Sequence, residues 1–106
     1  MVKAVGPNFR DVLNVLGMYP GDPGAPGGDC SGNVCSSSHE MAVLGLAPGS
    51  LRSYIGTDAR LLVSKPEWWS YEEASAMPTV WVTVWTGLEE LTAMSPGQSL
   101  LVHAAT

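Results

Sequence analysis

The chain has 106 residues, of which 45% are hydrophobic and 14% are charged, so it can bury one modest core but not two. The formal net charge of −5 and the lack of a basic patch argue against nucleic acid or an anionic membrane as a partner. The low charge content also indicates that some apolar surface packs against something outside the chain.

Neither a leader peptide nor a membrane span is predicted. The first residues, MVKAVG, lack the long apolar core of a signal peptide. The longest stretch without charge, residues 74–88, contains Pro78 and is too short and too broken to cross a bilayer. Two cysteines do not make a disulfide framework, so we expect a reducing, cytoplasmic location.

The first elements predicted are a strand and a helix. Residues 2–5 favour a short strand that ends at Gly6-Pro7, and Asn8 is placed to cap the helix that follows. Apolar side chains then recur at i, i+3, i+4 and i+7, which predicts one helix face against a core: Phe9, Val12, Leu13 and Leu16. Gly17 is placed to end this helix in the left-handed conformation.

The middle of the chain is rich in turn residues. Residues 20–32, PGDPGAPGGDCSG, predict an ordered loop, because the prolines restrict the backbone while the glycines allow the tight turns. Residues 33–42 have no clear period. Between Val43 and Lys65, three short apolar runs are separated by turn signals at Pro48-Gly49 and at residues 56–58. This pattern predicts antiparallel strands of a small barrel or curved sheet.

The last third of the chain favours helices and one further strand. Ser70 and Glu73 form a capping box that opens a helix, which Pro78 interrupts. A second helix is predicted from about Thr79, with one apolar stripe: Trp81, Val84, Trp85, Leu88 and Leu91. The run SLLVHAA is typical of a strand buried on both faces of a parallel sheet. The predicted class is mainly β with helices, α+β.

Two long stretches carry a resemblance. They are VGPNFRDVLNVLGMYPGDPG…GGDCSG and GLAPGSLRSY…DARLLVSKP…WSYEEASAMPTVWVTVWTGLEEL…SPGQSLLVHAA. In this order, and over nearly the whole chain, they resemble the enoyl reductase domain of type I polyketide synthases. That domain is part of the zinc-independent, quinone-oxidoreductase-like branch of the medium-chain dehydrogenase/reductases.

The resemblance implies two domains and one reaction. Residues 1–78 would form a GroES-like substrate domain, a partial barrel, and residues 79–106 the start of a Rossmann domain that binds NADPH. The reaction implied is hydride transfer from NADPH to the β-carbon of an enoyl thioester, followed by protonation of the α-carbon. The thioester would be carried on an acyl carrier protein, beside other polyketide synthase domains.

The sequence departs from the family in two places. It stops after the first predicted Rossmann strand, before the family's glycine-rich pyrophosphate turn, so we expect a fragment that is inactive by itself. The family also has a longer strand-turn-strand between GDCSG and GLAPG. The shorter stretch at residues 33–43 therefore predicts an incomplete barrel.

Three residues are the predicted site. The resemblance assigns Tyr19 to protonation and its stereochemistry, and a phenol on a proline-stiffened loop suits a rigidly held proton donor. It also places Asn8 and Thr83 next to the nicotinamide, so we expect Tyr19 on the wall of a cleft near these two residues, with its hydroxyl pointing into the cleft. Each has a purely structural alternative: Tyr19 packs at the base of a loop, Asn8 caps a helix, and Thr83 bonds back to a helix carbonyl.

No metal site is predicted. Cys30, Cys35 and His39 are spaced C-x4-C-x3-H, with His103 as a distant fourth ligand, but this spacing misses the common C-x2-C form. Zinc-dependent members of the superfamily carry a cysteine where Asn8 stands and a Gly-His-Glu where residues 27–29 stand. Neither the thiolate nor the imidazole is present at these positions.

Two functions remain open on the sequence. One is the substrate-binding part of an NADPH-dependent enoyl reductase within a polyketide synthase. The other is a non-catalytic GroES-like remnant or docking module. The glycine-rich turn that cradles a pyrophosphate distinguishes the two, because the first function requires it and the second does not.

Overall fold

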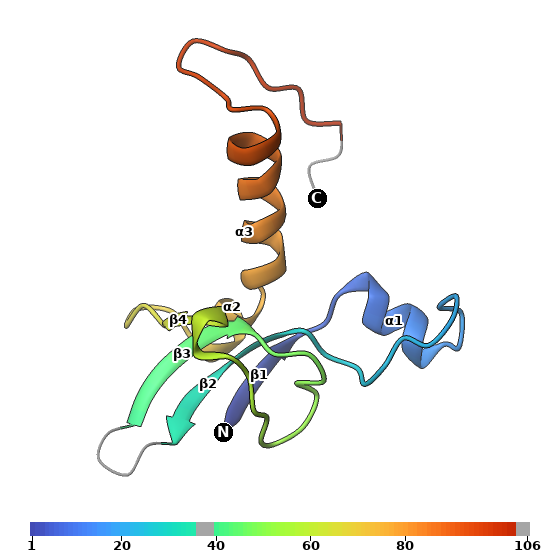
Figure 1. Cartoon of the computed structure of the whole chain (residues 1–106). Helices are drawn as coiled ribbons and strands as arrows, with labels where there is room; N and C mark the ends of the chain where they lie inside the picture. The colour runs from blue at the N-terminus through green and yellow to red at the C-terminus, as the bar shows by residue number, and fades with distance from the viewer. Residues whose placement is uncertain (36–39, 104–106) are drawn as a thin grey trace.

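The structure is a computed structural model that describes residues 1–35 and 40–103, and in them a four-stranded antiparallel sheet is accompanied by three α-helices (Figure 1). The strands lie side by side in chain order: β1 (Val2–Gly6), β2 (Asp29–Cys35), β3 (Glu40–Leu46) and β4 (Leu62–Ser64). The helices are α1 (Phe9–Val15), α2 (Tyr71–Ser75) and α3 (Pro78–Trp85). This architecture confirms the α+β class and is consistent with a partial barrel followed by helices.

A hairpin of β2 and β3 forms the centre of the sheet. The prediction of a loop over residues 20–32 is wrong for residues 29–32, which belong to β2. The pairing of β2 with β3 runs from Asp29 opposite Leu46 to Cys35 opposite Glu40, and the connecting residues 36–39 lie outside the described part. Residues 33–43, where the sequence departs from the family, therefore belong mainly to this hairpin. The outer strands are β1 and β4, so the sheet formed by the described residues is open.

Of the three apolar runs predicted as strands between Val43 and Lys65, only the first and the last form strands, β3 and β4. The prediction for the middle run, residues 51–55, is wrong. The Leu51 N–H donates to the Pro26 carbonyl at 3.3 Å, whereas the Ser53 carbonyl accepts from the Val2 N–H at 2.9 Å. Because these bonds lead to two different segments, they do not build a ladder, and residues 51–55 remain a loop.

Helix α1 begins and ends as predicted. Asn8 is the N-cap residue, and the Asp11 carboxylate accepts from the Asn8 N–H at 2.8 Å. At the other end Gly17 has φ +66° and donates to the Asn14 carbonyl, while the Met18 N–H donates to the Leu13 carbonyl at 2.8 Å. This is the Schellman arrangement, which requires a residue in the left-handed region.

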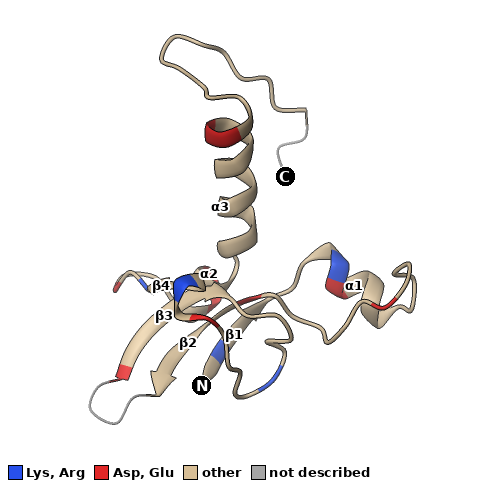
Figure 2. Cartoon of the chain, viewed as in Figure 1, with Lys and Arg blue, Asp and Glu red and all other residues tan. Residues whose placement is uncertain are grey.

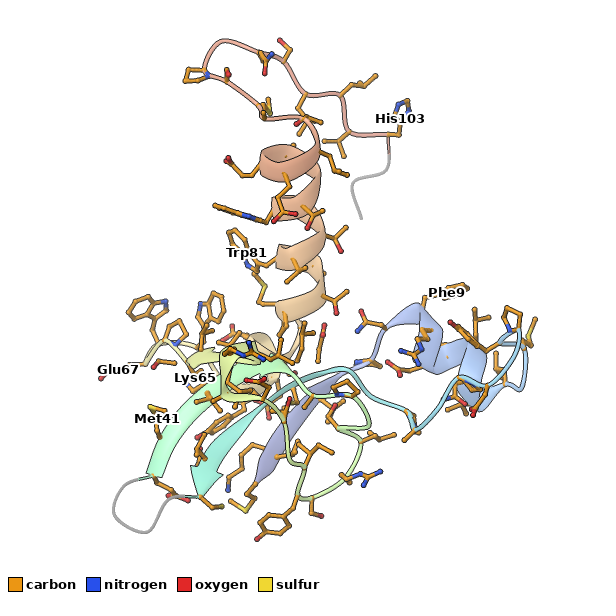
Figure 3. The ribbon with its side chains drawn as sticks, in the orientation of Figure 1. Phe9, Met41, Lys65, Glu67, Trp81 and His103 are labelled. Carbon is orange, nitrogen blue, oxygen red and sulfur yellow. The ribbon has the colours of Figure 1, made fainter. Side chains whose placement is uncertain are left out.

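The prediction that one face of α1 packs against a core is wrong. Phe9 is 74% exposed and Leu16 is 63% exposed, and α1 has no buried residue. The loop after α1 folds back onto its polar side, where Arg10 donates to the Pro23 carbonyl and Asn14 to the Gly24 carbonyl. No described element covers the apolar side, and Figure 3 shows Phe9 extending away from the sheet.

Helix α2 is short and firmly attached to the sheet. The predicted capping box is present, because Ser70 accepts from the Glu73 N–H at 3.1 Å and Glu73 accepts from the Ser70 N–H at 2.8 Å. The Tyr71 carbonyl accepts from Ser31 at 2.5 Å, and the Tyr71 hydroxyl donates to Asn33 at 2.6 Å, so both ends of this residue bind β2.

Helix α3 starts at Pro78, one residue before the predicted start, and continues as a wider π-helical turn, Thr86–Leu91. It projects away from the sheet and carries no charged side chain between Pro78 and Trp85 (Figures 1 and 2). Its predicted apolar stripe is largely uncovered: Trp81 is 56%, Trp85 57% and Leu91 78% exposed. The stripe has the predicted spacing, but no core of the described residues covers it.

The strand predicted for SLLVHAA is also wrong for the part that is described. Residues 99–103 have no regular structure, and residues 104–106 lie outside the described part. A strand of a parallel sheet needs a neighbour to bind its N–H and C=O groups, and no described strand runs beside these residues. Within the described ranges, no helix is long and apolar enough to cross a membrane.

The protruding parts make the chain less compact than a typical domain. Its Cα radius of gyration is 15.8 Å, compared with about 13 Å for a compact domain of about 100 residues. The core is correspondingly small, with a few buried apolar side chains on β2, on and directly after β3, and in α2: Cys30, Val43, Leu44, Ala47 and Ala74.

Candidate functional site

Four elements meet at one end of the sheet. Gly6, the last residue of β1, pairs with Asp29, the first residue of β2. Asn8, which opens α1, follows Gly6 by two residues. The Asp29 side chain in turn binds Thr79 in the first turn of α3. The starts of α1 and α3 are therefore brought to the same end of the sheet, and we call this place the helix junction.

Asp29 attaches α3 at the helix junction. Its side chain is buried, with 2% of the residue exposed. One carboxylate oxygen accepts from the Thr79 N–H at 3.1 Å and the other from the Thr79 hydroxyl at 2.6 Å. Pro78, the preceding residue, has no N–H, so Asp29 binds the first helical N–H that needs a partner. A carboxylate is also favourable beside the positive end of a helix dipole.

Asp11 attaches the Pro- and Gly-rich loop to α1. One of its oxygens accepts from the Asn8 N–H and the other from the Gly27 N–H, both at 2.8 Å. Gly27 has φ +95°, and a Cβ at this position would lie 2.5 Å from the Leu51 nitrogen. Only glycine fits at this position. Its hydrogen bond to Asp11 and its close contact with Leu51 fix this part of the loop, in line with the order predicted from the composition.

Tyr19 lies against the first turn of α1. Its side chain is half-buried, and the guanidinium of Arg10 lies 5.6 Å from the centre of its ring. Arg10 also donates to the Pro23 carbonyl, so the same cation holds both the ring and the loop beyond it. Among the described residues, the Tyr19 hydroxyl has no hydrogen-bond partner.

Thr83 lies one helical turn beyond the helix junction. Its exposed side chain donates to the Thr79 carbonyl at 2.7 Å, which is the structural alternative considered for this residue. The structure thus connects Thr83 to Asp29 through Thr79, and it places Asn8 at the same end of the sheet. Tyr19 is connected to the first turn of α1 through Arg10. Whether Asn8, Tyr19 and Thr83 line one cleft stays a prediction.

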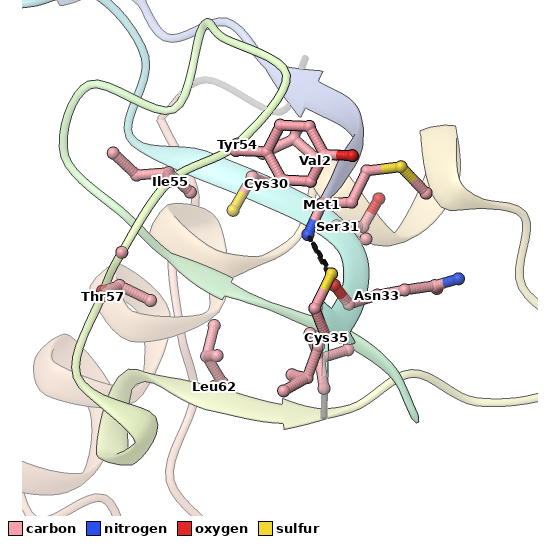
Figure 4. A pocket seen from close by; sticks show the side chains of 14 residues that line it. Met1, Val2, Cys30, Ser31, Asn33, Cys35, Tyr54, Ile55, Thr57 and Leu62 are labelled. Carbon is pink, nitrogen blue, oxygen red and sulfur yellow. Dashed lines mark hydrogen bonds between the residues drawn. The ribbon is translucent and has the colours of Figure 1, made fainter. Parts of the chain in front are cut away.

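Among the described residues, two apolar hollows lie beside the sheet. The first, about 300 Å³, is lined by residues of β1 and β2 and by the loop 54–57 (Figure 4). The second, about 460 Å³, lies between the β3–β4 edge and the base of α3, where Trp69, Met77 and Trp81 line it. None of the three predicted site residues lines either hollow.

Cys30 and Cys35 have different surroundings, although both line the first hollow. Burial raises the pKa of the Cys30 thiol, and the adjacent Asp29 carboxylate raises it further, with a smaller opposing effect of the N-terminal charge. Cys35 is exposed. In residues 1–35 and 40–103, no three His, Cys, Asp or Glu side chains are grouped so as to hold a metal ion. His39 lies outside these ranges, so the absence of a metal stays a prediction.

Sequence reasoning missed Asp29, Thr79 and Arg10 as a group that positions the site. Asp29 is the first residue of β2, whose sequence DCSGNVC is largely polar, so nothing local marks its carboxylate as buried. Its partner is 50 residues away in the chain, and no local pattern identifies it. Arg10 was missed because an arginine on a short amphipathic helix is ordinarily a solvated side chain.

No protein-family model matches the chain. Its relatives are type I polyketide synthases. A phenolphthiocerol synthesis polyketide synthase type I from Mycobacterium marinum is 38% identical over 113 aligned positions, which cover 99% of this chain and 5% of the relative. An erythronolide synthase from Saccharopolyspora erythraea and a pikromycin polyketide synthase component from Streptomyces venezuelae are 39% and 36% identical. Each alignment covers 98% of this chain and 3% of the relative. The chain is thus homologous to a short segment of type I polyketide synthases.

Proposed function

We propose that this chain is the substrate-side part of an NADPH-dependent enoyl reductase domain of a type I polyketide synthase. The supporting observation is the alignment with polyketide synthases over 98–99% of the chain, in the same stretch whose motifs resemble enoyl reductases. In this proposal residues 1–78 are the GroES-like substrate domain and residues 79–106 begin the Rossmann domain. The open antiparallel sheet, with a helix attached at one end, is compatible with this division.

The cofactor would be held on one side by the helix junction. The amide of Asn8 can donate and accept hydrogen bonds, and the hydroxyl of Thr83, which donates to the Thr79 carbonyl, can still accept one, which suits the carboxamide of a nicotinamide ring. These two groups come from different helices, both of which start at the same end of β1 and β2. NADPH, when bound, supplies the hydride for the β-carbon of the enoyl thioester.

Tyr19 is the proposed proton donor to the α-carbon. The phenol needs a fixed position beside the substrate for this role, because proton transfer requires hydrogen-bond reach. Arg10 holds the ring, and the loop that follows is tied to α1 through Asp11 and Asn14. The hydroxyl has no described partner, so it is available to bind an oxygen or to protonate a carbanion.

The proposed partners follow from the same assignment. The substrate is an enoyl thioester carried on an acyl carrier protein, and other synthase domains would contact this segment. The apolar sides of α1 and α3 are uncovered by the described residues and suit such contacts. Nucleic acid and membrane are not proposed as partners, and the cytoplasmic location stays a prediction.

One observation favours the second candidate, a non-catalytic docking module. The exposed surface of α3 is apolar and free of charge, and Trp81 and Trp85 are the kind of side chains that dominate binding energy at protein interfaces. A docking role requires this surface alone, whereas the reductase role requires the helix junction and Tyr19 as well.

A hybrid synthase separates the two candidates. The chain would replace the corresponding segment of a polyketide synthase that reduces enoyl thioesters, and NADPH consumption with an enoyl thioester would be measured. We expect reduction in the hybrid and none after deletion of the same segment. A hybrid that keeps the other synthase activities but reduces no enoyl thioester would contradict the reductase role and favour the docking module.

A further inference from the structure

Two different kinds of attachment hold the helices that follow the sheet. Helix α2 is fixed by Tyr71, which binds β2 through its carbonyl and its hydroxyl, and by the close approach of its end to Gly6. Helix α3 follows after only two residues, but it projects away from the sheet with most of its side chains exposed. Its direction is therefore decided at its first turn.

The first turn of α3 has one polar attachment to the sheet among the described residues, the pair of bonds from Thr79 to Asp29. Both oxygens of the carboxylate are used, one by the N–H and one by the hydroxyl of the same residue. A single hydrogen bond would let α3 rotate about it, whereas two hydrogen bonds between Asp29 and Thr79 restrict this rotation. The Thr83 hydroxyl, which donates to the Thr79 carbonyl, is the next polar group along the helix.

We propose that Asp29 is a positioning residue: its carboxylate sets the direction of α3 and thereby the place of Thr83 relative to Asn8 and Tyr19. This inference rests on the function proposed above for these three residues. The residue type matters, because an asparagine has one acceptor oxygen for the Thr79 N–H and an NH2 group in place of the other. The Thr79 hydroxyl would then have to accept from this NH2 group, and its own hydrogen would lose the Asp29 oxygen as acceptor. Burial sharpens the difference, since an unpaired polar group at this place has no water to bind.

The direction of α3 can be measured on the chain itself. Spin labels on Cys35, which is exposed on β2, and on a cysteine introduced by Val84→Cys on α3 report the distance between sheet and helix. Cys30 would be replaced by Ala, so that only these two positions are labelled. Double electron–electron resonance on labelled chain diluted with an excess of unlabelled chain, which suppresses distances between associated chains, then gives the distribution of distances for each variant.

We expect one narrow distance distribution for the labelled parent chain and a broadened or shifted one for Asp29→Asn and Thr79→Val. Thr79→Ser keeps both the N–H and the hydroxyl and should restore the narrow distribution. Thr92→Val is the matched control, because its hydroxyl bonds only within the helical segment, to the Leu88 carbonyl. A parent-like distribution in Asp29→Asn, or equal distributions for the Val and Ser variants of Thr79, would overturn the proposal. If Asp29→Asn fails to fold, the comparison of Thr79→Val with Thr79→Ser tests the proposal by itself.

The kinetic consequence can be measured in the hybrid synthase. We expect Asp29→Asn and Thr79→Val to lower kcat about 10- to 100-fold, because a misplacement of about 1 Å has this effect on aligned reactants. The KM for the enoyl thioester should stay nearly constant, and Thr79→Ser should recover kcat. A general loss of folding would instead reduce the amount of active enzyme in all variants without a rescue by serine.

The two proposals can fail separately. If the hybrid with the natural chain reduces no enoyl thioester, the proposed function fails, and the distance distributions still decide whether Asp29 positions α3. If the hybrid is active and Asp29→Asn leaves kcat and the distance distribution unchanged, the positioning role fails while the proposed function stands.

Discussion

Gly6 is the position where the smallest substitution should have a large effect. It ends β1 directly against the last turn of α2, and a Cβ there would lie 2.1 Å from the Ser75 carbonyl oxygen. This is roughly 1 Å closer than carbon and oxygen atoms approach without a covalent bond. The nearest atoms are backbone atoms of Ser75 and Ala76. Because α2 is held by its capping box and by Tyr71, this backbone cannot move away easily.

Gly6→Ala should therefore destabilise the sheet–α2 contact by about 1–3 kcal/mol, the usual cost of forcing atoms into a packed site. In a domain of about 100 residues, each kcal/mol corresponds to a fall in Tm of about 4–8 °C. Thermal unfolding followed by far-ultraviolet circular dichroism, at low protein concentration, measures this shift. Gly56→Ala is the matched control, because a Cβ at Gly56 meets nothing within 4 Å. Equal midpoints for the two variants would refute the packing described for Gly6.

Four further predictions concern individual side chains. In the hybrid synthase, Tyr19→Phe should slow protonation or change the configuration of the α-carbon, and an unchanged rate and configuration would remove Tyr19 from the mechanism. Elemental analysis should find far less than one zinc per chain, whereas a stoichiometric zinc that is lost in Cys35→Ser would show a metal site. Burial raises the pKa of the Cys30 thiol, so less reactive thiolate forms at neutral pH; a thiol reagent should modify Cys35 first and Cys30 only at higher pH, and equal rates would contradict this order. The isolated chain should self-associate through α3, and Trp81→Glu should reduce association in sedimentation velocity; no change would exclude this surface.

Local sequence patterns were sufficient for the helix ends but not for the central hairpin, since residues 29–32 were predicted as loop and residues 33–42 without a period. The N-cap Asn8, the terminator Gly17 and the capping box of Ser70 and Glu73 each act over three or four residues. Pro78 likewise marks the start of a helix because it lacks an N–H and its φ suits the first turn. Their effects depend on neighbours in the chain, so the sequence alone is enough to predict them.

Apolar periodicity was less informative, because it states which side of a helix is apolar but not what covers it. The stripe containing Phe9 and the one containing Trp81 have the expected spacing, yet both are exposed in the described structure. The run at residues 99–103 has the composition of a buried strand and forms none, since a strand exists only with a partner to bind its backbone.

The sequence by itself determined the helix ends, the α+β class and the list of polar side chains that are candidates for chemistry. Only the tertiary structure decided which of them meet. Asp29 and Thr79 are 50 residues apart, and Arg10 reaches the ring of Tyr19 only because the chain reverses at Gly17. The physical reason is that hydrogen bonds and cation–ring contacts act over a few ångströms of space, and such proximity between distant residues follows from strand pairing and helix packing.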